Sequence, residues 1–288
     1  MTVARDPKQL EPAERAVAIG TFDGVHRGHV AVVEAALAAG LRSAVLTFDP
    51  HPRTVFGYEV HLLATLERRL ELLTELGVED VLVVRFTEEV SQWSPEEFVD
   101  RVLRPVGARI VVAGADFRFG RGRAGDLALL ERLGFETRPV PLVEGASSTA
   151  VREALRAGDI PAAAQLLGRA PELEGPVVHG DQRGGTLGFP TANLAVPNDL
   201  MVPSFGIYVG SALGHRAAVS IGVNPHYGGD ERRIEAFLLD YEGDLYGRTL
   251  RLALWRKLRD ERAFGSEEEL VAQIARDAAA ARSAAPPL

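Results

Sequence analysis

The chain has no cysteine, few lysines and no long run of apolar residues. Without cysteine it can form neither disulfides nor iron–sulfur clusters, and it can use neither a thiol nucleophile nor a Cys-zinc site. No segment approaches the ~20 apolar residues of a membrane helix, and the N-terminal segment is too polar for a signal peptide. We therefore expect a cytoplasmic protein with no membrane partner.

Positive charge is also scarce. Lys8 and Lys257 are the only lysines, and 40 acidic residues against 32 basic ones give a formal net charge of −8. A protein that coats nucleic acid needs a basic face, so we expect no nucleic-acid partner. A P-loop kinase is excluded because no G-x-x-x-x-G-K-[ST] motif is present. An anionic ligand must be held by Arg, His, backbone N–H groups or a metal ion.

The 288 residues, 46% of them hydrophobic, are typical of a globular chain of two domains or of one large domain. In the first part, strand and helix patterns alternate, which predicts an α/β domain with a parallel, Rossmann-like sheet. After an expected linker at 168–176, strands follow one another, which predicts a small antiparallel β-barrel or sandwich with a terminal helix. We place the domains at 1–168 and 169–288.

The periodicity also predicts individual elements. The expected strands of the first domain are 17–19, 43–48, 81–86, 109–113 and 137–142, and its helices are 30–39, 65–76, 95–103, 127–133, 148–157 and 162–167. The expected strands of the second domain are 177–179, 206–213, 217–222, 234–240 and 249–257, and its helix is 266–280.

The strongest signal in the first domain is A-I-G-T-F-D-G-V-H-R-G-H. A strand ends at Ile19, Gly20 and Gly24 permit a sharp turn, and His26 and His29 stand where a helix begins. The spacing places both imidazoles on one face of the first helical turn, where free N–H groups and the helix dipole favour an anion. We expect the pair to bind a transferring phosphoryl group and stabilise departing pyrophosphate. The alternatives are two surface histidines or a metal site that lacks obvious further ligands.

Three other segments carry polar groups at the ends of predicted strands or at the start of a helix: T-F-D-P-H-P (47–52), G-A-D-F-R-F-G-R-G-R-A-G (114–125) and S-S-T-A-V-R (147–152). In open α/β sheets, ligands bind at the carboxyl ends of the strands. The last segment offers hydroxyls, N–H groups and a permanent Arg charge, which together suit the β- and γ-phosphates of a nucleotide. Taken separately, these segments are more typical of a turn and a helix start.

The pattern G-x-F-D-G-x-H-x-G-H resembles the nucleotidyltransferase superfamily that uses H-x-G-H. With the other three segments in order, residues 15–168 resemble the adenylyltransferase module of bacterial bifunctional riboflavin kinase/FAD synthetases. The resemblance implies that this domain joins FMN with AMP from ATP, with His26 and His29 as catalytic residues. It also implies nucleotide-binding roles for Gly20, Phe22, Asp23, Gly24, Asp116, Ser147, Ser148, Thr149 and Arg152, and flavin-binding roles for Phe48, Pro50 and His51. Asp116 has the alternative of a turn former beside Phe117.

The strongest signal in the second domain is H-G-D-Q-R-G-G-T-L-G-F-P-T-A-N-L (179–194). Its glycines allow the backbone to approach a ligand closely, and Pro190 stiffens the chain before Thr191. The Thr191 hydroxyl and the Asn193 amide oxygen suit Mg²⁺, which takes substrate phosphates and waters as its other ligands. A glycine-rich loop with proline could be only a turn, but the string G-F-P-T-A-N is more specific.

Some forty residues later, Glu235 lies in a predicted strand and shares a face with Phe237. An unpaired glutamate inside a strand is costly, so it is either exposed or functional. A carboxylate beside Mg-ATP can accept the proton of an attacking alcohol. The alternative is a solvated strand residue.

Residues 175–277 resemble the riboflavin kinase module of the same family, which is a small β-barrel. The resemblance rests on G-x-V-x-x-G, G-F-P-T-A-N, I-G-x-x-P, the glutamate strand, D-L-Y-G and L-R-x-E. It implies that Thr191 and Asn193 serve Mg-ATP and that Glu235 is the base for the ribityl 5′-hydroxyl. It further implies nucleotide-binding roles for Gly180, Arg183, Gly188 and Pro190, and flavin-binding roles for Arg259, Gln273 and Ile274.

Two positions depart from the family pattern. Gly185 stands where the family commonly has Arg, and His226 where it commonly has Thr. Either the module tolerates these changes, or its kinase activity or nucleotide choice differs. Several aromatic residues could stack on a flavin but are more often core: Phe22, Phe56, Phe189, Tyr208 and Trp255.

We expect an enzyme of two activities with ATP, riboflavin and FMN as substrates and Mg²⁺ at both sites. The alternatives are a specialised relative with one activity or another nucleotide or flavin, and a non-catalytic flavin-binding regulator. An oligomer is compatible with the sequence, which does not define its size.

Overall fold

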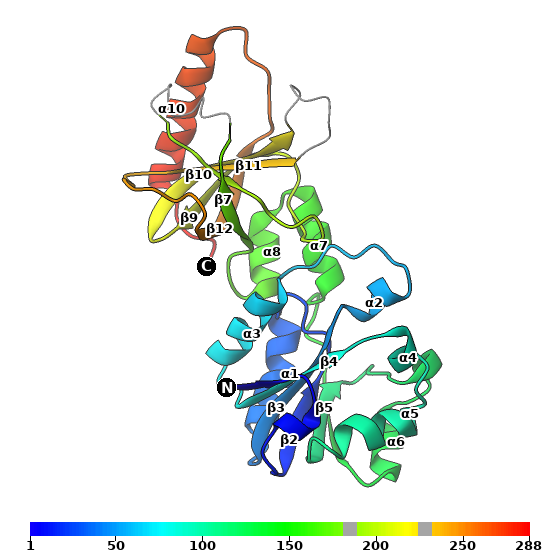
Figure 1. Ribbon diagram of the computed structural model, residues 1–288. Helices are drawn as coiled ribbons and strands as arrows, with labels where there is room; N and C mark the ends of the chain where they lie inside the picture. Colours follow the sequence, from blue (N-terminus) through cyan, green and yellow to red (C-terminus); the bar gives the residue numbers. More distant parts are fainter. Residues whose placement is uncertain (181–188, 224–231) are drawn as a thin grey trace. The chain divides into compact units, whose positions relative to one another are not determined.

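The computed structural model describes residues 1–180, 189–223 and 232–288. Contacts divide the chain into two compact units, Met1–Ser148 and Thr149–Leu288 (Figure 1). By contacts, the segment 149–168 groups with the second unit, whereas the sequence boundary at residue 168 stays a prediction.

The first unit contains one parallel sheet in the order β1-β4-β3-β2-β5-β6. Its strands are β1 (Thr2–Ala4), β2 (Arg15–Ile19), β3 (Arg42–Asp49), β4 (Asp80–Arg85), β5 (Ala108–Gly114) and β6 (Glu136–Val140). From β2 the chain adds β3 and β4 on one side of that strand, and then crosses to add β5 and β6 on the other side. The carboxyl ends of β2 and β5 therefore flank the switch point at which ligands bind in such sheets. The predicted Rossmann-like sheet is confirmed.

Helices cover both faces of this sheet, because the middle parts of its central strands carry apolar side chains on both faces. Val17 and Ile19 of β2 pack on one face in a cluster that includes Leu103, and Ala16 and Ala18 pack on the other in a cluster that includes Leu73. The helical segments are η1 (Pro7–Gln9), α1 (Arg27–Leu37), α2 (Pro52–Val55), α3 (Leu66–Glu75), α4 (Glu88–Ser91), α5 (Pro95–Phe98), η2 (Val99–Leu103), η3 (Arg121–Arg123) and α6 (Leu127–Arg132). The clusters place α1 and α3 on one face and α5, η2 and α6 on the other (Figure 1).

The second unit is a closed barrel in the order β10-β11-β8-β7-β12-β9, preceded by two helices and followed by one. Its elements are α7 (Ser148–Ala157), α8 (Ile160–Leu167), β7 (Glu172–Val178), β8 (Ala192–Leu194), β9 (Gly206–Ala212), β10 (His215–Val223), β11 (Arg232–Leu238), β12 (Thr249–Arg259) and α10 (Glu267–Ser283). All its strand pairs are antiparallel, so the predicted barrel with a terminal helix is confirmed.

Part of the expected linker proves to be strand. Residues from Glu172 onward form β7, in which Leu173, Gly175 and Val177 face the barrel interior while Pro176 is exposed. Gly175 is required there because a Cβ would overlap the Ala195 carbonyl of the neighbouring chain segment. Gly and Pro thus mark a close approach and an outward position in a strand, not a linker.

The terminal helix α10 lies against the outside of the barrel. Ala278 and Ala281 pack with Val209 and Trp255, so small side chains let the helix approach the strands closely. Of the helices in the described residues, none is long and apolar enough to cross a membrane.

Candidate active sites

The structure brings His26 and His29 together at the start of α1. His26 is the N-cap residue, and its Nδ1 accepts a hydrogen bond from the His29 backbone N–H at 3.3 Å. The two rings stack with centroids 3.6 Å apart. Burial, followed by the charges of His26 and Arg69, lowers the pKa of His29 well below its ordinary value of 6.5. His29 is therefore neutral at pH 7, and its buried Nδ1 has no hydrogen-bond partner among the described residues.

The turn that leads to these histidines has an unfavourable backbone. Phe22 and Val25 have φ angles of +50° and +40°, a region that side chains other than glycine rarely adopt. Such residues cost about 1–3 kcal/mol each and persist only where the surroundings hold them. Gly24 has φ +79°, and a Cβ there would lie 2.8 Å from the Leu63 side chain. The turn is thus a strained segment that neighbouring groups must fix.

Two hydrogen bonds to Asp23 help to fix this turn. The Asp23 carboxylate is wholly buried and accepts the Leu63 backbone N–H at 2.8 Å. Its carbonyl accepts the Ser148 hydroxyl at 3.0 Å. Asp23 therefore holds the turn through these bonds, and its predicted nucleotide-binding role stays a prediction. Ser148, which begins α7, lies beside the histidine turn.

The other predicted residues of this site fall at the ends of strands and at the start of α7. Asp116 is exposed just beyond β5, the strand next to β2. Ser147 and Thr149 are exposed, and Arg152 is half-buried on α7. Thr149 and Arg152 belong to the second compact unit, and their part in a shared nucleotide site stays a prediction.

An aromatic surface follows β3. His51 caps α2, where its Nδ1 accepts the Arg53 N–H at 3.2 Å. Phe48 and Phe56 both contact Phe86 edge-on, with centroids 5.6 Å and 6.1 Å from it. Phe56 is 56% exposed, whereas Phe22, Tyr208 and Trp255 are core residues. Exposure is what separates Phe56 from the other aromatic candidates.

In the barrel, strand register places Asn193 directly opposite Glu235. Asn193 on β8 pairs with Glu235 on β11 and with Val178 on β7. A Cβ on Gly180 would overlap the Asn193 side-chain amide, so only glycine at position 180 leaves room for that amide. The Glu235 carboxylate is 3.4 Å from the Arg233 guanidinium, and both side chains are less than one-third exposed, at 28% and 29%.

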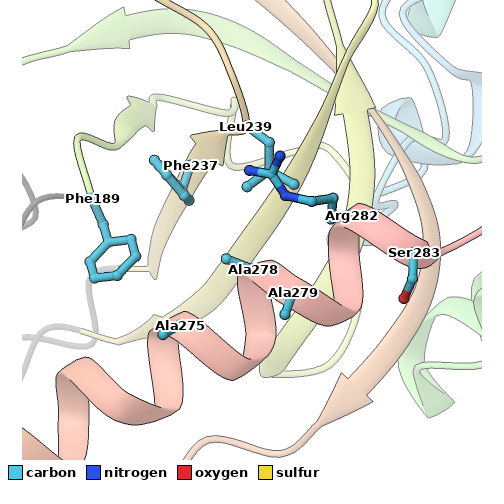
Figure 2. A pocket seen from close by; sticks show the side chains of 8 residues that line it. All are labelled: Phe189, Phe237, Leu239, Ala275, Ala278, Ala279, Arg282 and Ser283. Carbon is cyan, nitrogen blue, oxygen red and sulfur yellow. The ribbon is translucent and has the colours of Figure 1, made fainter.

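Two cavities are lined by residues that lie close in the sequence to this pair. Pro190 and Thr191 line a cavity of about 170 Å³ together with the segment 241–246, in which Tyr246 stacks on His179 at 3.9 Å. A second cavity of about 440 Å³ lies between β11 and α10. Figure 2 shows its lining, with Phe189 and Phe237 on the barrel side and Ala275, Ala278, Ala279 and Arg282 on α10. Glu235 is two residues from Phe237, and Asn193 is two residues from Thr191. Glu235 and Asn193 themselves are not among the described residues that line either cavity, so their contact with a ligand there stays a prediction.

The predicted flavin residues near the end of the chain form a network of their own. The Arg259 guanidinium pairs with the buried Asp277 carboxylate at 2.7 Å. Gln273 donates to Asp277 at 2.8 Å and accepts from Arg262 at 2.8 Å. Arg259, Gln273 and Ile274 are absent from the lining of both cavities described above. Their flavin contact stays a prediction, and sequence analysis missed Asp277, which joins them.

Several predicted residues lie outside the described residues: Arg183, Gly185, Gly188 and the turn with His226.

Two family models match the chain in the order of its two folds. The model described as FAD synthetase matches residues 8–151, and the model described as riboflavin kinase matches residues 167–285. A bifunctional riboflavin kinase/FMN adenylyltransferase of Listeria monocytogenes is 38% identical over 282 residues, which cover 91% of this chain and 90% of that protein. The chain belongs to the bifunctional riboflavin kinase/FMN adenylyltransferase family.

A second relative carries the same family name, and a solved structure has the same fold. The family member of Escherichia coli K12 is 38% identical over 284 residues, with 92% of this chain and 90% of that protein covered. A crystal structure described as a macrolide-efflux protein from Streptococcus pneumoniae has the same fold, with a TM-score of 0.89 and 30% identity, and covers 98% of this chain and 99% of that one. The family predicted from the motifs is confirmed.

The barrel of this chain also carries oxygen groups of the kind that Mg²⁺ binds, the Thr191 hydroxyl and the Asn193 amide oxygen. Thr191 lines the smaller cavity. The Asn193 amide occupies the space that a Cβ at position 180 would otherwise fill. The described residues contain no group of three or more His, Cys, Asp or Glu side chains that could hold a metal alone. Mg²⁺ usually takes few protein ligands and completes its shell with waters and phosphates, so this pair fits the ion.

Proposed function

We propose that this chain catalyses both reactions named for its family. The barrel unit transfers the γ-phosphoryl group of ATP to riboflavin, which yields FMN and ADP. The parallel-sheet unit joins FMN with AMP from a second ATP and releases pyrophosphate. The observation that carries the proposal is that each unit has its own set of polar groups: stacked imidazoles at a helix start in the first unit, and Glu235 paired in register with Asn193 in the barrel.

In the kinase step, Glu235 accepts the proton of the ribityl 5′-hydroxyl. The hydroxyl oxygen then bonds to the γ-phosphorus as the bond to the β,γ-bridging oxygen breaks and ADP leaves. The larger cavity, of about 440 Å³, is within the size range of small-molecule sites and offers Phe189 and Phe237 to the flavin ring. Thr191 and Asn193 would hold Mg²⁺, which supplies neutralisation of phosphate charge.

In the adenylyl-transfer step, an oxygen of the FMN phosphate bonds to the α-phosphorus of ATP while the bond to pyrophosphate breaks. No covalent enzyme intermediate is needed, because positioning and charge stabilisation suffice for phosphoryl chemistry. His26 Nδ1 accepts a backbone N–H, so neutral His26 carries its proton on Nε2 and can donate it to a phosphate oxygen. We assign the exposed Phe56, with Phe48 and His51, to the flavin side of this site.

We also propose Mg²⁺ as the cofactor of both sites, small molecules as the partners and the cytoplasm as the compartment. The sequence features described above support these assignments.

Product analysis tests the proposed function. The purified chain is incubated with Mg²⁺, ATP and riboflavin, or with Mg²⁺, ATP and FMN, and the flavins are separated by chromatography. We expect FMN followed by FAD in the first mixture and FAD in the second. A single product, or product with CTP or GTP alone, would indicate a specialised relative. Tight flavin binding without turnover would indicate a regulator.

A further inference from the structure

Arg69 is a buried cation that the chemistry described so far does not use. It lies on α3 and is only 2% exposed. One guanidinium nitrogen, Nη1, donates to three neutral oxygens: the Thr21 carbonyl at 3.0 Å, the Thr47 hydroxyl at 3.1 Å and the Phe48 carbonyl at 3.0 Å. Its Nε is buried and has no hydrogen-bond partner among the described residues. An arginine is therefore buried here with its hydrogen bonds incompletely satisfied.

Such burial is unfavourable for the charge. Desolvation lowers the pKa of Arg69, and the opposing charges of Asp23, Asp49 and Glu67 raise it only in part. An apolar side chain of similar length would fill this position in the core without that cost. The guanidinium must therefore contribute something that packing alone would not.

The three acceptors of Arg69 lie at the ends of two neighbouring strands. Thr21 follows β2 and immediately precedes Phe22, the first residue of the strained turn. Thr47 and Phe48 belong to the last part of β3, just before the segment that contains His51. Because arginine can only donate, the Thr47 hydroxyl is free to donate its own proton to the Thr21 carbonyl, at 2.9 Å. Arg69 and Thr47 thus close a triangle of hydrogen bonds between the two segments.

We propose that Arg69 is a positioning residue for adenylyl transfer, which holds the histidine turn and the segment 48–51 at a fixed mutual distance. The inference rests on the proposed function, in which the histidines bind the ATP phosphates and the second segment binds FMN. The distance between the attacking FMN phosphate and the α-phosphorus then depends on how these two segments are held. Arg69 itself touches neither substrate.

Arg69 also acts on His29 through its charge. His29 is faced by Arg69, whose permanent charge opposes its protonation, and by His26, which opposes it only when its own ring is charged; Asp23, Asp49 and Glu67 lie in turn around Arg69. Removal of the Arg69 charge should raise the pKa of His29, so that His29 becomes protonated at a higher pH. The acidic limb of the rate profile for FAD formation should then move to higher pH.

The test compares R69M, R69K and T47V with R68M as the matched control. Arg68 is the neighbouring residue on α3, and its guanidinium pairs with Glu71 and Glu75 instead. The kcat and KM of FAD formation are measured against pH in the full chain, and the kinase rate of each preparation is measured beside them.

We expect R69M to lower kcat for FAD formation by about 100-fold, the effect of roughly 1 Å of misplacement, with less than about a threefold change in KM. Its acidic limb should shift to higher pH, which an inactive fraction of protein would not cause. R69K should recover part of kcat because lysine keeps the charge but lacks the planar donors. T47V should lower kcat less than R69M does, and R68M should match the wild type.

An unchanged kcat in R69M, or a lowered kcat with an unmoved acidic limb and no recovery in R69K, would overturn the proposal. Should R69M not fold, unchanged kcat in both R69K and T47V would overturn it equally. Absence of FAD formation in the wild type would instead contradict the proposed function, so the two failures are distinct.

Discussion

The two units of this chain position their polar groups by different means. In the parallel-sheet unit, the histidine turn and the segment after β3 extend beyond the strands, and buried side chains such as Asp23 and Arg69 hold them. In the barrel unit, Glu235 and Asn193 lie within strands, and the antiparallel ladder itself sets them opposite each other. A site on loops depends on side-chain hydrogen bonds, whereas a site on strands depends on register.

The histidine turn and the Glu235 strand differ in backbone strain. The turn before α1 contains two side-chain-bearing residues at positive φ, and it is fixed by contacts from β3, α3 and Ser148. The described part of β11 needs no such support, because each residue from Arg232 to Leu238 pairs with β10. We therefore expect the first site to be sensitive to substitutions outside its catalytic residues, and the second to depend mainly on groups that touch substrate.

The largest effect that separates the two units should come from E235Q. The amide cannot accept the proton of the ribityl hydroxyl, so FMN formation should fall by about 10²–10⁴-fold, while conversion of FMN to FAD stays unchanged. Separate assays with riboflavin and with FMN measure the two steps. E174Q is the matched control, because Glu174 on β7 pairs with Arg251 of β12 and lines neither cavity. Equal loss of both steps in folded E235Q would show that the sites are not separate.

The reverse separation is expected for H29A. Loss of this imidazole should lower FAD formation by about 10²–10³-fold, the effect of one lost charge-stabilising donor, and leave the kinase rate intact. The same pair of assays measures it. A kinase rate that fell in parallel would contradict the assignment of His29 to one unit.

A smaller effect is expected at Gly180, which takes no part in the chemistry but leaves room for the Asn193 amide. In G180A, the new Cβ would displace the Asn193 amide, so the kinase rate should fall by about 10–100-fold and need more Mg²⁺, as for other groups that orient metal ligands. Rates at increasing Mg²⁺ measure the change. G265A is the control, since a Cβ there makes only ordinary contact with Glu269 at 3.5 Å. An unchanged Mg²⁺ requirement in G180A would separate Asn193 from the metal.

The smallest effect concerns stability and pH. Burial, then His26 and Arg69, lower the pKa of His29 below 6.5 in the folded chain, so the unfolded chain binds more protons below that pH. The free energy of unfolding should therefore fall as pH drops below about 6.5, by at most about 1.4 kcal/mol per pH unit from this group. Urea unfolding followed by Trp93 fluorescence in a W255F background measures it. H29Q should show a flatter dependence between pH 7.5 and 5.5, and equal slopes in both proteins would rule this contribution out.

The elements that sequence analysis predicted well are those with a strong periodic pattern. β2, β3 and β5 are buried on both faces and appear as continuous apolar runs, and α1 follows a capped glycine turn. β8 has only three residues, too few for an alternating pattern. The expected linker overlaps β7 because glycine and proline at 175 and 176 are typical of linkers, and only the neighbouring Ala195 segment explains the glycine.

The candidate sites were predictable as far as local motifs extend. The histidine pair and the Thr191–Asn193 pair each lie within a few residues. The structure stacks the two imidazoles, places Thr191 at the smaller cavity and pairs Asn193 with Glu235. Asp277 and Arg69 contact residues far away in the sequence, and no local motif marks them. One signal for Arg69 was present: it shares a helical stripe with Leu72, Leu73 and Leu76, where a charged residue is unusual. Residues 181–188 and 224–231 lie outside the described structure, so the roles of Arg183, Gly188 and His226 stay predictions.

Complementation tests the central claim, that one chain carries two independent active sites, most directly. E235Q and H29A are each incubated with riboflavin, ATP and Mg²⁺, separately and as an equimolar mixture. We predict that E235Q forms neither product, that H29A accumulates FMN, and that the mixture forms FAD at a rate approaching that of the wild type. A mixture that makes no FAD, although H29A supplies FMN and E235Q is folded, would contradict two separable sites.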